Sequence, residues 1–142
     1  YRRQRQMCIR GSGYKPSIAY IDGIVKALDG DKNVVGYVIT VTDKEGYGGN
    51  IQFTIGIQSD GTINGVSFLS IEETAGVGMK AKENKFKSQF EGRKVDSFEY
   101  TKNGATADNQ IDAISGATIT TNAVTNGVNT GILAYKFVME AN

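Results

Sequence analysis

Alternating apolar and polar residues predict strands in the first half of the chain. Residues 51–57 place isoleucine or phenylalanine at every second position, which is the period of a half-buried strand. Residues 34–42 are rich in β-branched and aromatic side chains, which favour strands. Asp60-Gly61 is a typical hairpin turn, and residues 63–71 are expected to return as the next strand.

Residues 18–28 give an ambiguous pattern, because their apolar positions have no clear period and Gly23 lies near the middle. A turn-rich segment at 29–33 separates them from the strand at 34–42. They form the first strand of a hairpin or begin as a helix, and the pattern leaves both open. With the hairpin, the first half of the chain is an antiparallel meander of about four strands.

Helical spacing replaces alternation further along. Residues 79–90 carry apolar side chains among lysines, which predicts an amphipathic helix that ends at Gly92. These apolar residues are Met79, Phe86 and Phe90. Residues 93–110 are mostly polar, with one expected strand at 95–100.

A final helix is predicted over residues 120–139. Its core stripe recurs at steps of four, four and three residues and consists of Val124, Val128, Ile132 and Tyr135. Gly127 and Gly131 each cost a helix about 1 kcal/mol against alanine, which is tolerated if they let the helix lie close to a sheet. The predicted fold is α+β: an antiparallel β-sheet meander with two main helices packed on it, in a single domain.

Charge divides the 142-residue chain unevenly. Five basic residues precede the first acidic residue, and the rest carries 11 basic and 15 acidic side chains, a net charge of −4. That balance argues against a nucleic-acid-binding face. Residues 1–16 are predicted to be a basic leader and residues 17–142 the folded domain. The leader is a membrane-proximal stretch, or a linker or tag remnant, because Gly11-Ser12-Gly13 resembles a cloned linker.

The composition also excludes several chemistries. The chain has no histidine and a single cysteine, Cys8. A Ser–His–Asp triad, a Cys–His pair and an internal disulfide are therefore ruled out, and no metal site is predicted. The sequence contains no run of 18 apolar residues that would span a membrane.

The segment 112–121 holds the most informative chemistry. It is a small-residue loop that opens the final helix, and Gly116 and Ala117 let an anion approach the backbone closely. Its hydroxyl residues are Ser115, Thr118, Thr120 and Thr121. From the residues alone, this is a phosphate site at a helix start or a plain helix cap.

The string D-x-x-S-G-A-T, here Asp112 to Thr118, resembles the flavin-attachment motif of the FMN-binding domain family. That family includes the G subunit of the Rnf electron-transport complex and the C subunit of the sodium-translocating NADH:quinone oxidoreductase. The resemblance implies that Thr118 is joined to the phosphate of FMN by a dedicated flavin transferase. Asp112 would then serve transferase recognition or act as a loop-fixing acceptor.

Two further segments resemble the same family, in the same order. Gly46 to Gly49 is similar to its G-Y-G-G-P-I turn, with Asn50 in place of the usual proline. The loop E-T-A-G-V-G at 73–78 is similar to its E-T-P-G-L-G loop, with Ala75 for proline and Val77 for leucine. The resemblance therefore covers roughly residues 34–135.

The resemblance also implies roles for the residues around the flavin. The phosphate is expected near the backbone of Ser115, Gly116, Ala117, Ile119 and Thr120. The isoalloxazine ring is expected to face Glu73, Thr74, Gly76, Val77 and Gly78. Lys80 balances the charge of reduced flavin or is a solvated helix residue. Tyr47 contacts the flavin or packs the hairpin.

The function implied is electron relay within a membrane-bound, ion-translocating complex of the Rnf or Nqr type, without independent turnover. The resemblance implies the other subunits as partners, a native N-terminal membrane helix and a location on the extracytoplasmic face. Two alternatives stay open. One is an extracellular or reductase-associated flavin module that passes electrons to another acceptor, and the other is a non-redox binding or surface module.

Overall fold

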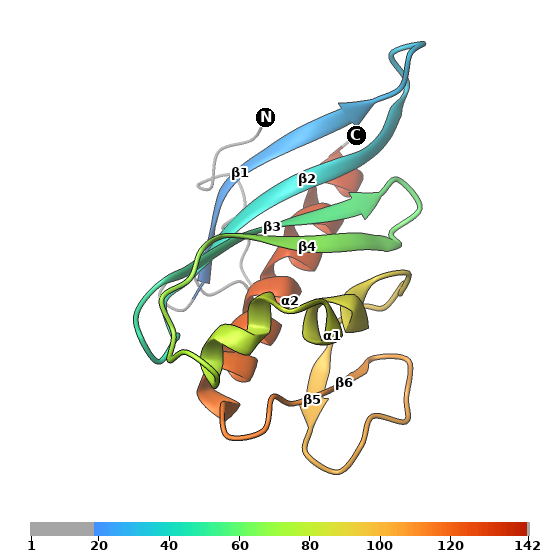
Figure 1. Ribbon diagram of the computed structural model, residues 1–142. Coiled ribbons are helices and arrows are strands. Elements are labelled where there is room, and N and C mark those ends of the chain that lie inside the picture. The colour runs from blue at the N-terminus through green and yellow to red at the C-terminus, as the bar shows by residue number, and fades with distance from the viewer. Residues whose placement is uncertain (1–18, 142) are drawn as a thin grey trace.

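Four antiparallel strands form the main sheet of the computed structural model, which describes residues 19–141. Their order in the sheet is their order in the chain (Figure 1). They are β1 (Ala19–Leu28), β2 (Val34–Asp43), β3 (Ile51–Gln58) and β4 (Ile63–Ser70). The predicted meander is confirmed, and the ambiguous first element is a strand from Ala19 onward. The leader expected at 1–16 lies outside the described residues.

A β-bulge explains why the first strand has no clean period. The pairing of β1 with β2 shifts between Ile21 and Gly23, so Asp22 is the extra residue. Ile21 and Ile24 consequently both face the core, where each is at most 2% exposed. Two core residues three positions apart are a helical spacing, although they lie on one strand.

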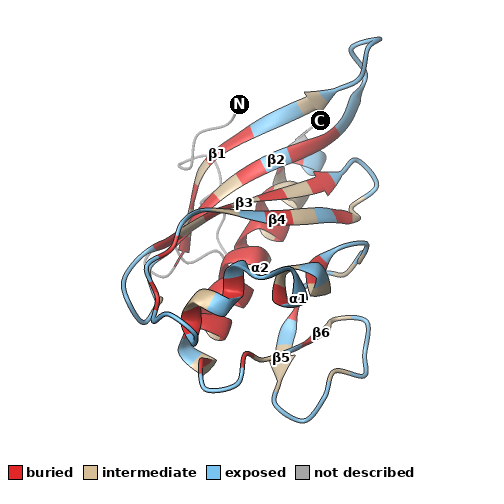
Figure 2. Ribbon diagram, viewed as in Figure 1, coloured by how far each residue is buried: buried red, intermediate tan, exposed pale blue. Residues whose placement is uncertain are grey.

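The long helix α2 (Thr118–Ala141) crosses one face of this sheet and contacts β1, β2 and β3 (Figure 1). Buried residues lie along both the sheet and the helix (Figure 2) and belong to one hydrophobic core. The helix approaches closely at its two glycines: a Cβ on Gly127 would lie 2.5 Å from Cζ of Phe53, and one on Gly131 would overlap Cδ1 of Ile55. The predicted close approach of this helix to the sheet is confirmed.

The helix predicted at 79–90 is wrong as a continuous element. The structure has three short pieces instead: η2 (Gly78–Lys82), α1 (Asn84–Lys87) and η3 (Ser88–Phe90). Glu83, at φ −74° and ψ 145°, is extended and interrupts them. Between Met79 and Phe86 only the small Ala81 is buried, so no apolar stripe holds a continuous helix against the core.

The strand predicted at 95–100 is also corrected. The structure places β5 at Glu99–Thr101, where it pairs in parallel with β6 (Gln110–Asp112). This two-stranded sheet lies beyond η3, below the main sheet in Figure 1. The sequence of β6 contains no pattern that predicts a strand. Over residues 19–141, no helix combines the length and apolar character that crossing a membrane requires.

Asp43, the last residue of β2, is a fully buried carboxyl. One oxygen accepts a hydrogen bond of 2.7 Å from the N–H of Glu45, and Oδ2 has no hydrogen-bond partner. Burial raises the pKa of Asp43 from 3.8 to about 7; the Glu45 N–H opposes this shift, and the nearby Glu45 carboxylate adds to it. The folded protein therefore favours the neutral form of this side chain below about pH 7.

Gly127→Ala is expected to destabilise the protein, although alanine favours helices by about 1 kcal/mol. The added methyl group meets the ring of Phe53, and overpacking a close-packed core costs about 1–3 kcal/mol. Urea unfolding measures the difference, with Asn122→Ala on the same helix as the control for propensity. A Gly127→Ala protein that is more stable than wild type would contradict the close packing.

Asp43 predicts a specific pH dependence of stability. Its folded pKa, about 7, lies above the unfolded value, so the folded state binds more protons between these values. Its contribution to the free energy of unfolding therefore falls as pH rises from about 4 to 7, by up to about 4 kcal/mol. We expect Asp43→Asn to gain stability relative to wild type on going from pH 5 to pH 8, as measured by urea unfolding. Parallel pH profiles would refute the assignment.

Candidate functional site

Three segments far apart in sequence enclose a cleft of about 460 Å³. They are the turn after β2, the loop after β4 and the start of α2. The lining residues are Tyr47, Thr74, Val77, Gly78, Gly116, Ala117, Thr118, Ile119 and Thr120. The volume falls within the range of small-molecule and cofactor sites.

The loop before α2 is a tight turn that delivers Thr118 as the first helical residue. The Ala117 N–H donates to the Ile114 carbonyl at 3.0 Å, and Gly116 has φ +76°, which is the form of a type II turn. The Thr121 hydroxyl fastens this turn, because it accepts from the Ile114 N–H at 3.0 Å and donates to the Ala117 carbonyl at 2.9 Å. The first N–H groups of the 24-residue helix lack intrahelical acceptors and adjoin the cleft.

The loop after β4 contains a second turn of the same form. The Val77 N–H donates to the Thr74 carbonyl at 3.1 Å, and Gly76 has φ +74°. Like Gly116, Gly76 has open space where a Cβ would stand, so each glycine is required by its backbone angle rather than by crowding. Two glycine-containing turns thus lie at the edge of the cleft.

The carboxylate of Glu73 joins the three segments. Its Oε1 accepts from the Tyr47 N–H at 2.9 Å and from the Thr120 hydroxyl at 2.6 Å. Its Oε2 accepts from the Gly48 N–H at 2.5 Å. Glu73 is only 9% exposed, and such a buried carboxylate is stable only when hydrogen bonds replace its water.

Two glycines leave room for this carboxylate. A Cβ on Gly78 would lie 2.6 Å from both Cβ of Glu73 and Oγ1 of Thr120. A Cβ on Gly48 would lie 2.8 Å from Oε2 of Glu73 and would overlap the Glu72 carbonyl. Both contacts are closer than real Cβ atoms allow, so these positions require glycine while the carboxylate stays in place.

Apolar side chains stay exposed around the cleft. Tyr47 is 70% exposed, Ile119 53% and Val77 36%, and all three line it. Exposed apolar side chains that gather at one concave surface indicate a ligand site. Together with the helix start, they suit a ligand with a flat apolar body and an anionic end, so the residues present fit a flavin with a phosphate.

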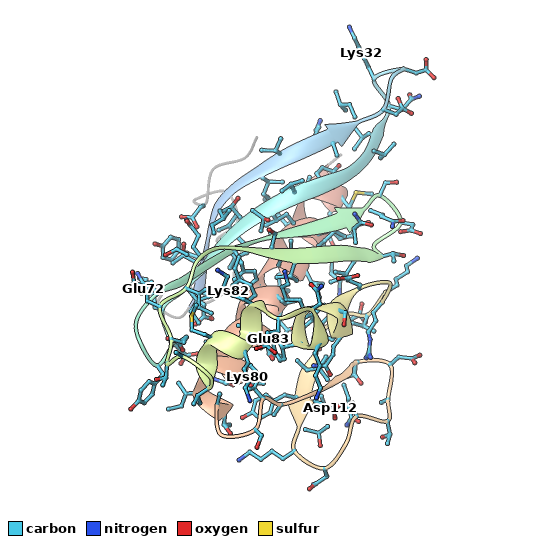
Figure 3. The ribbon with its side chains drawn as sticks, viewed as in Figure 1. Lys32, Glu72, Lys80, Lys82, Glu83 and Asp112 are labelled. Carbon is cyan, nitrogen blue, oxygen red and sulfur yellow. The ribbon has the colours of Figure 1, made fainter. Side chains whose placement is uncertain are left out.

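The predicted site residues do not all line this cleft. Glu73 lies behind its wall, and Gly76 serves the turn. Ser115 and Lys80 line a neighbouring cavity of about 520 Å³ instead. Figure 3 shows Lys80 on the η2 side of the molecule, where it is exposed.

Of the two roles expected for Asp112, the structure shows that of a loop-fixing acceptor, and a second contact from Gln89, which sequence reasoning missed, also holds the start of the 112–118 motif. Asp112 accepts from the Ala105 N–H at 2.7 Å through its carboxylate, which is a loop-fixing contact. The amide of Gln89 pairs with the Asp112 backbone, accepting its N–H at 2.6 Å and donating to its carbonyl at 3.1 Å. A glutamine 23 residues away gives no sequence signal for such a contact.

Comparisons with known proteins find a matching family and similar sequences. A family model described as the FMN-binding domain matches residues 46–132. The G subunit of the Na(+)-translocating ferredoxin:NAD(+) oxidoreductase complex of Acetobacterium woodii is 39% identical over 105 residues, which cover 72% of this chain and 50% of that protein. The G subunit of the proton-translocating ferredoxin:NAD(+) oxidoreductase complex of Clostridium ljungdahlii is 37% identical over 106 residues, with 75% and 56% covered. The chain thus spans about half the length of these relatives.

Solved structures share the fold. The C subunit of the Na(+)-translocating NADH-quinone reductase from Parabacteroides distasonis matches with a TM-score of 0.64 at 25% identity, covering 84% of this chain and 61% of that one. NqrC from Shewanella oneidensis matches with a TM-score of 0.63 at 19% identity, covering 89% and 73%. The second match supports the fold alone.

Ala75→Pro is expected to stabilise the protein by about 0.4–1 kcal/mol. Ala75 is exposed and holds the second position of the 74–77 turn, where proline presets the required φ of a type II turn. Ala113→Pro is the matched control, because it removes the bond from the Ala113 N–H to the Thr101 carbonyl and should destabilise. The comparison is made by urea unfolding, and a loss of stability in Ala75→Pro would exclude this turn geometry.

Proposed function

Because the chain belongs to the FMN-binding domain family, we propose that it is an electron-transfer domain carrying FMN esterified to Thr118. The observation that carries this proposal is the position of Thr118. It opens a 24-residue helix and lines a cleft surrounded by exposed apolar side chains. An anion tied to its hydroxyl would meet the positive end of that helix.

The phosphate end is assigned to the helix start. The N–H groups of Ile119 and Thr120 are free of intrahelical acceptors, and the turn at 114–117 brings Gly116 and Ala117 to the cleft. Ser115 holds the second position of that turn. Helix N-termini of this kind bind phosphates through backbone donors and the helix dipole.

Attachment requires an activated phosphate. We propose that a flavin transferase uses a flavin dinucleotide as donor. The Thr118 oxygen then bonds to the FMN phosphorus, the hydroxyl proton leaves, and the donor phosphoanhydride breaks to release a nucleoside monophosphate. The protein contributes a hydroxyl held at a fixed point, since the Thr121 cap fixes the preceding turn.

The ring end is assigned to the loop after β4. Thr74, Val77 and Gly78 line the cleft together with Ile119 and Tyr47. Apolar side chains would pack the ring, and the backbone at Gly78 would bond its polar edge. FMN supplies one- and two-electron chemistry when bound. A tether replaces rebinding with an effective concentration on the order of millimolar, so the cleft can stay open to electron partners.

We propose that the domain relays electrons within an ion-translocating membrane complex. Support comes from the two relatives, which are subunits of ferredoxin:NAD(+) oxidoreductase complexes named as Na(+)- and proton-translocating. The other subunits would be its electron partners. The proposal includes an N-terminal membrane helix and a location on the extracytoplasmic face.

Thr118→Ala should abolish covalent flavin. Wild type co-expressed with a flavin transferase is expected to give a fluorescent band on a denaturing gel and an intact mass increased by FMN less one water. The variant should show neither, because it lacks the accepting oxygen. Its stability should change by only about 0.5 kcal/mol, as for most substitutions of partly exposed residues.

Thr106→Ala, in an exposed loop, is the matched control and should keep both the fluorescence and the mass increase. Fluorescence that persists in Thr118→Ala would move the attachment point elsewhere. A wild-type protein that stays unmodified in the presence of active transferase would contradict the covalent assignment.

A further inference from the structure

The Glu73 carboxylate lies directly behind the wall of the cleft. Two residues that line the cleft touch this side chain. Thr120 donates its hydroxyl to Oε1 at 2.6 Å, and Gly78 is so close that a Cβ there would lie 2.6 Å from Cβ of Glu73. The charge is therefore separated from the cleft by one layer of atoms.

Neutral groups alone hold this charge among the described residues. Its three hydrogen-bond donors are two backbone N–H groups and one hydroxyl. Across residues 19–141 the ion pair is Lys136–Asp96, so no cationic side chain lies within 4.0 Å of Glu73. Lys80, the cation in the next segment, lines the neighbouring cavity. Within residues 19–141, the Glu73 charge therefore has no ion-pair partner.

We infer that Glu73 is a positioning residue whose buried charge lowers the reduction potential of the flavin in the cleft. The inference rests on the function proposed above. Two-electron reduction of a flavin with uptake of one proton adds one negative charge to the ring, the electrons coming from a neighbouring donor protein of the complex. A fixed anion behind a low-dielectric wall disfavours that added charge. Glu73 thus tunes the cofactor without touching it.

The test compares three flavinylated variants with wild type by spectroelectrochemical titration. Glu73→Gln removes the charge at constant length. Glu73→Asp keeps the charge and shortens the side chain, and so loosens the hydrogen bonds. Glu72→Gln is the matched control, because Glu72 is exposed and lies at the rim of the loop after β4 (Figure 3).

Glu73→Gln should shift the midpoint potential to a more positive value. The shift should correspond to a change of about tenfold in the ratio between the affinity for reduced flavin and the affinity for oxidised flavin. The shift should persist in 0.5 M salt, since buried charges are poorly screened. Glu72→Gln should leave the potential unchanged. Glu73→Asp should lower the melting temperature yet keep a potential close to that of wild type, which a purely structural role would not produce.

Equal potentials in wild type and Glu73→Gln would overturn the inference, and so would a positive shift in Glu73→Asp as large as that in Glu73→Gln. If Glu73→Gln fails to fold, a large positive shift in Glu73→Asp still overturns the inference. If wild type acquires no covalent flavin, the covalent assignment fails. A binding titration with free FMN then replaces the spectroelectrochemical measurement. Oxidised FMN should bind more tightly than reduced FMN, and the ratio of these two affinities should be smaller in Glu73→Gln. Absence of any flavin binding would overturn both proposals.

Discussion

The hydrogen bonds to Glu73 are the interaction on which the cleft depends. Removing a carboxylate from water is costly, and three donors offset that cost in a charge-assisted geometry. Two of these donors are backbone N–H groups of the turn after β2, and the third is a hydroxyl on α2. The partners lie 25, 26 and 47 residues from Glu73 in the chain. The cleft therefore forms only when the whole fold has closed, and no single motif builds it.

The depth at which α2 lies on the sheet is the second constraint. Gly127 and Gly131 set this depth, because the side chains of Phe53 and Ile55 occupy the space where their Cβ atoms would stand. A helix is stiff over several turns, so a fixed depth at these glycines also fixes the position of its first residue. Thr120 then meets Glu73, and Thr118 faces the loop after β4. Packing far from the cleft thus decides where the Thr118 hydroxyl lies.

Sequence reasoning succeeded where one local pattern determines one element. Strand β3 alternates without interruption, and α2 has a complete apolar stripe, so both were predictable. The bulge at Asp22 broke the period of β1, and the three short pieces at 78–90 lack a continuous stripe. The parallel pairing of β5 with β6 joins segments with no alternation. These elements are determined by tertiary contacts, which a local window does not contain.

The site likewise has features that a local pattern predicts and features that tertiary contacts determine. The motif at 112–118 located the cleft, because backbone form and hydroxyl position are local properties. The direction of Glu73 was not predictable. The family resemblance implied that Glu73 faces the ring, whereas its three donors come from remote segments and hold it behind the cleft wall. Ser115 and Lys80 likewise line the neighbouring cavity, which no local pattern indicated.

The two turns explain why the departures from the family pattern leave the cleft intact. In both turns the glycine at the third position supplies the positive φ, and a backbone hydrogen bond closes the turn. Proline at the second position would only reduce the freedom of the unfolded chain, so Ala75 lowers stability without changing the folded shape. Val77 keeps an apolar side chain on the cleft wall in place of leucine. What the cleft requires is glycine where a Cβ would collide or strain the backbone, and one carboxylate with three donors, and this chain keeps both.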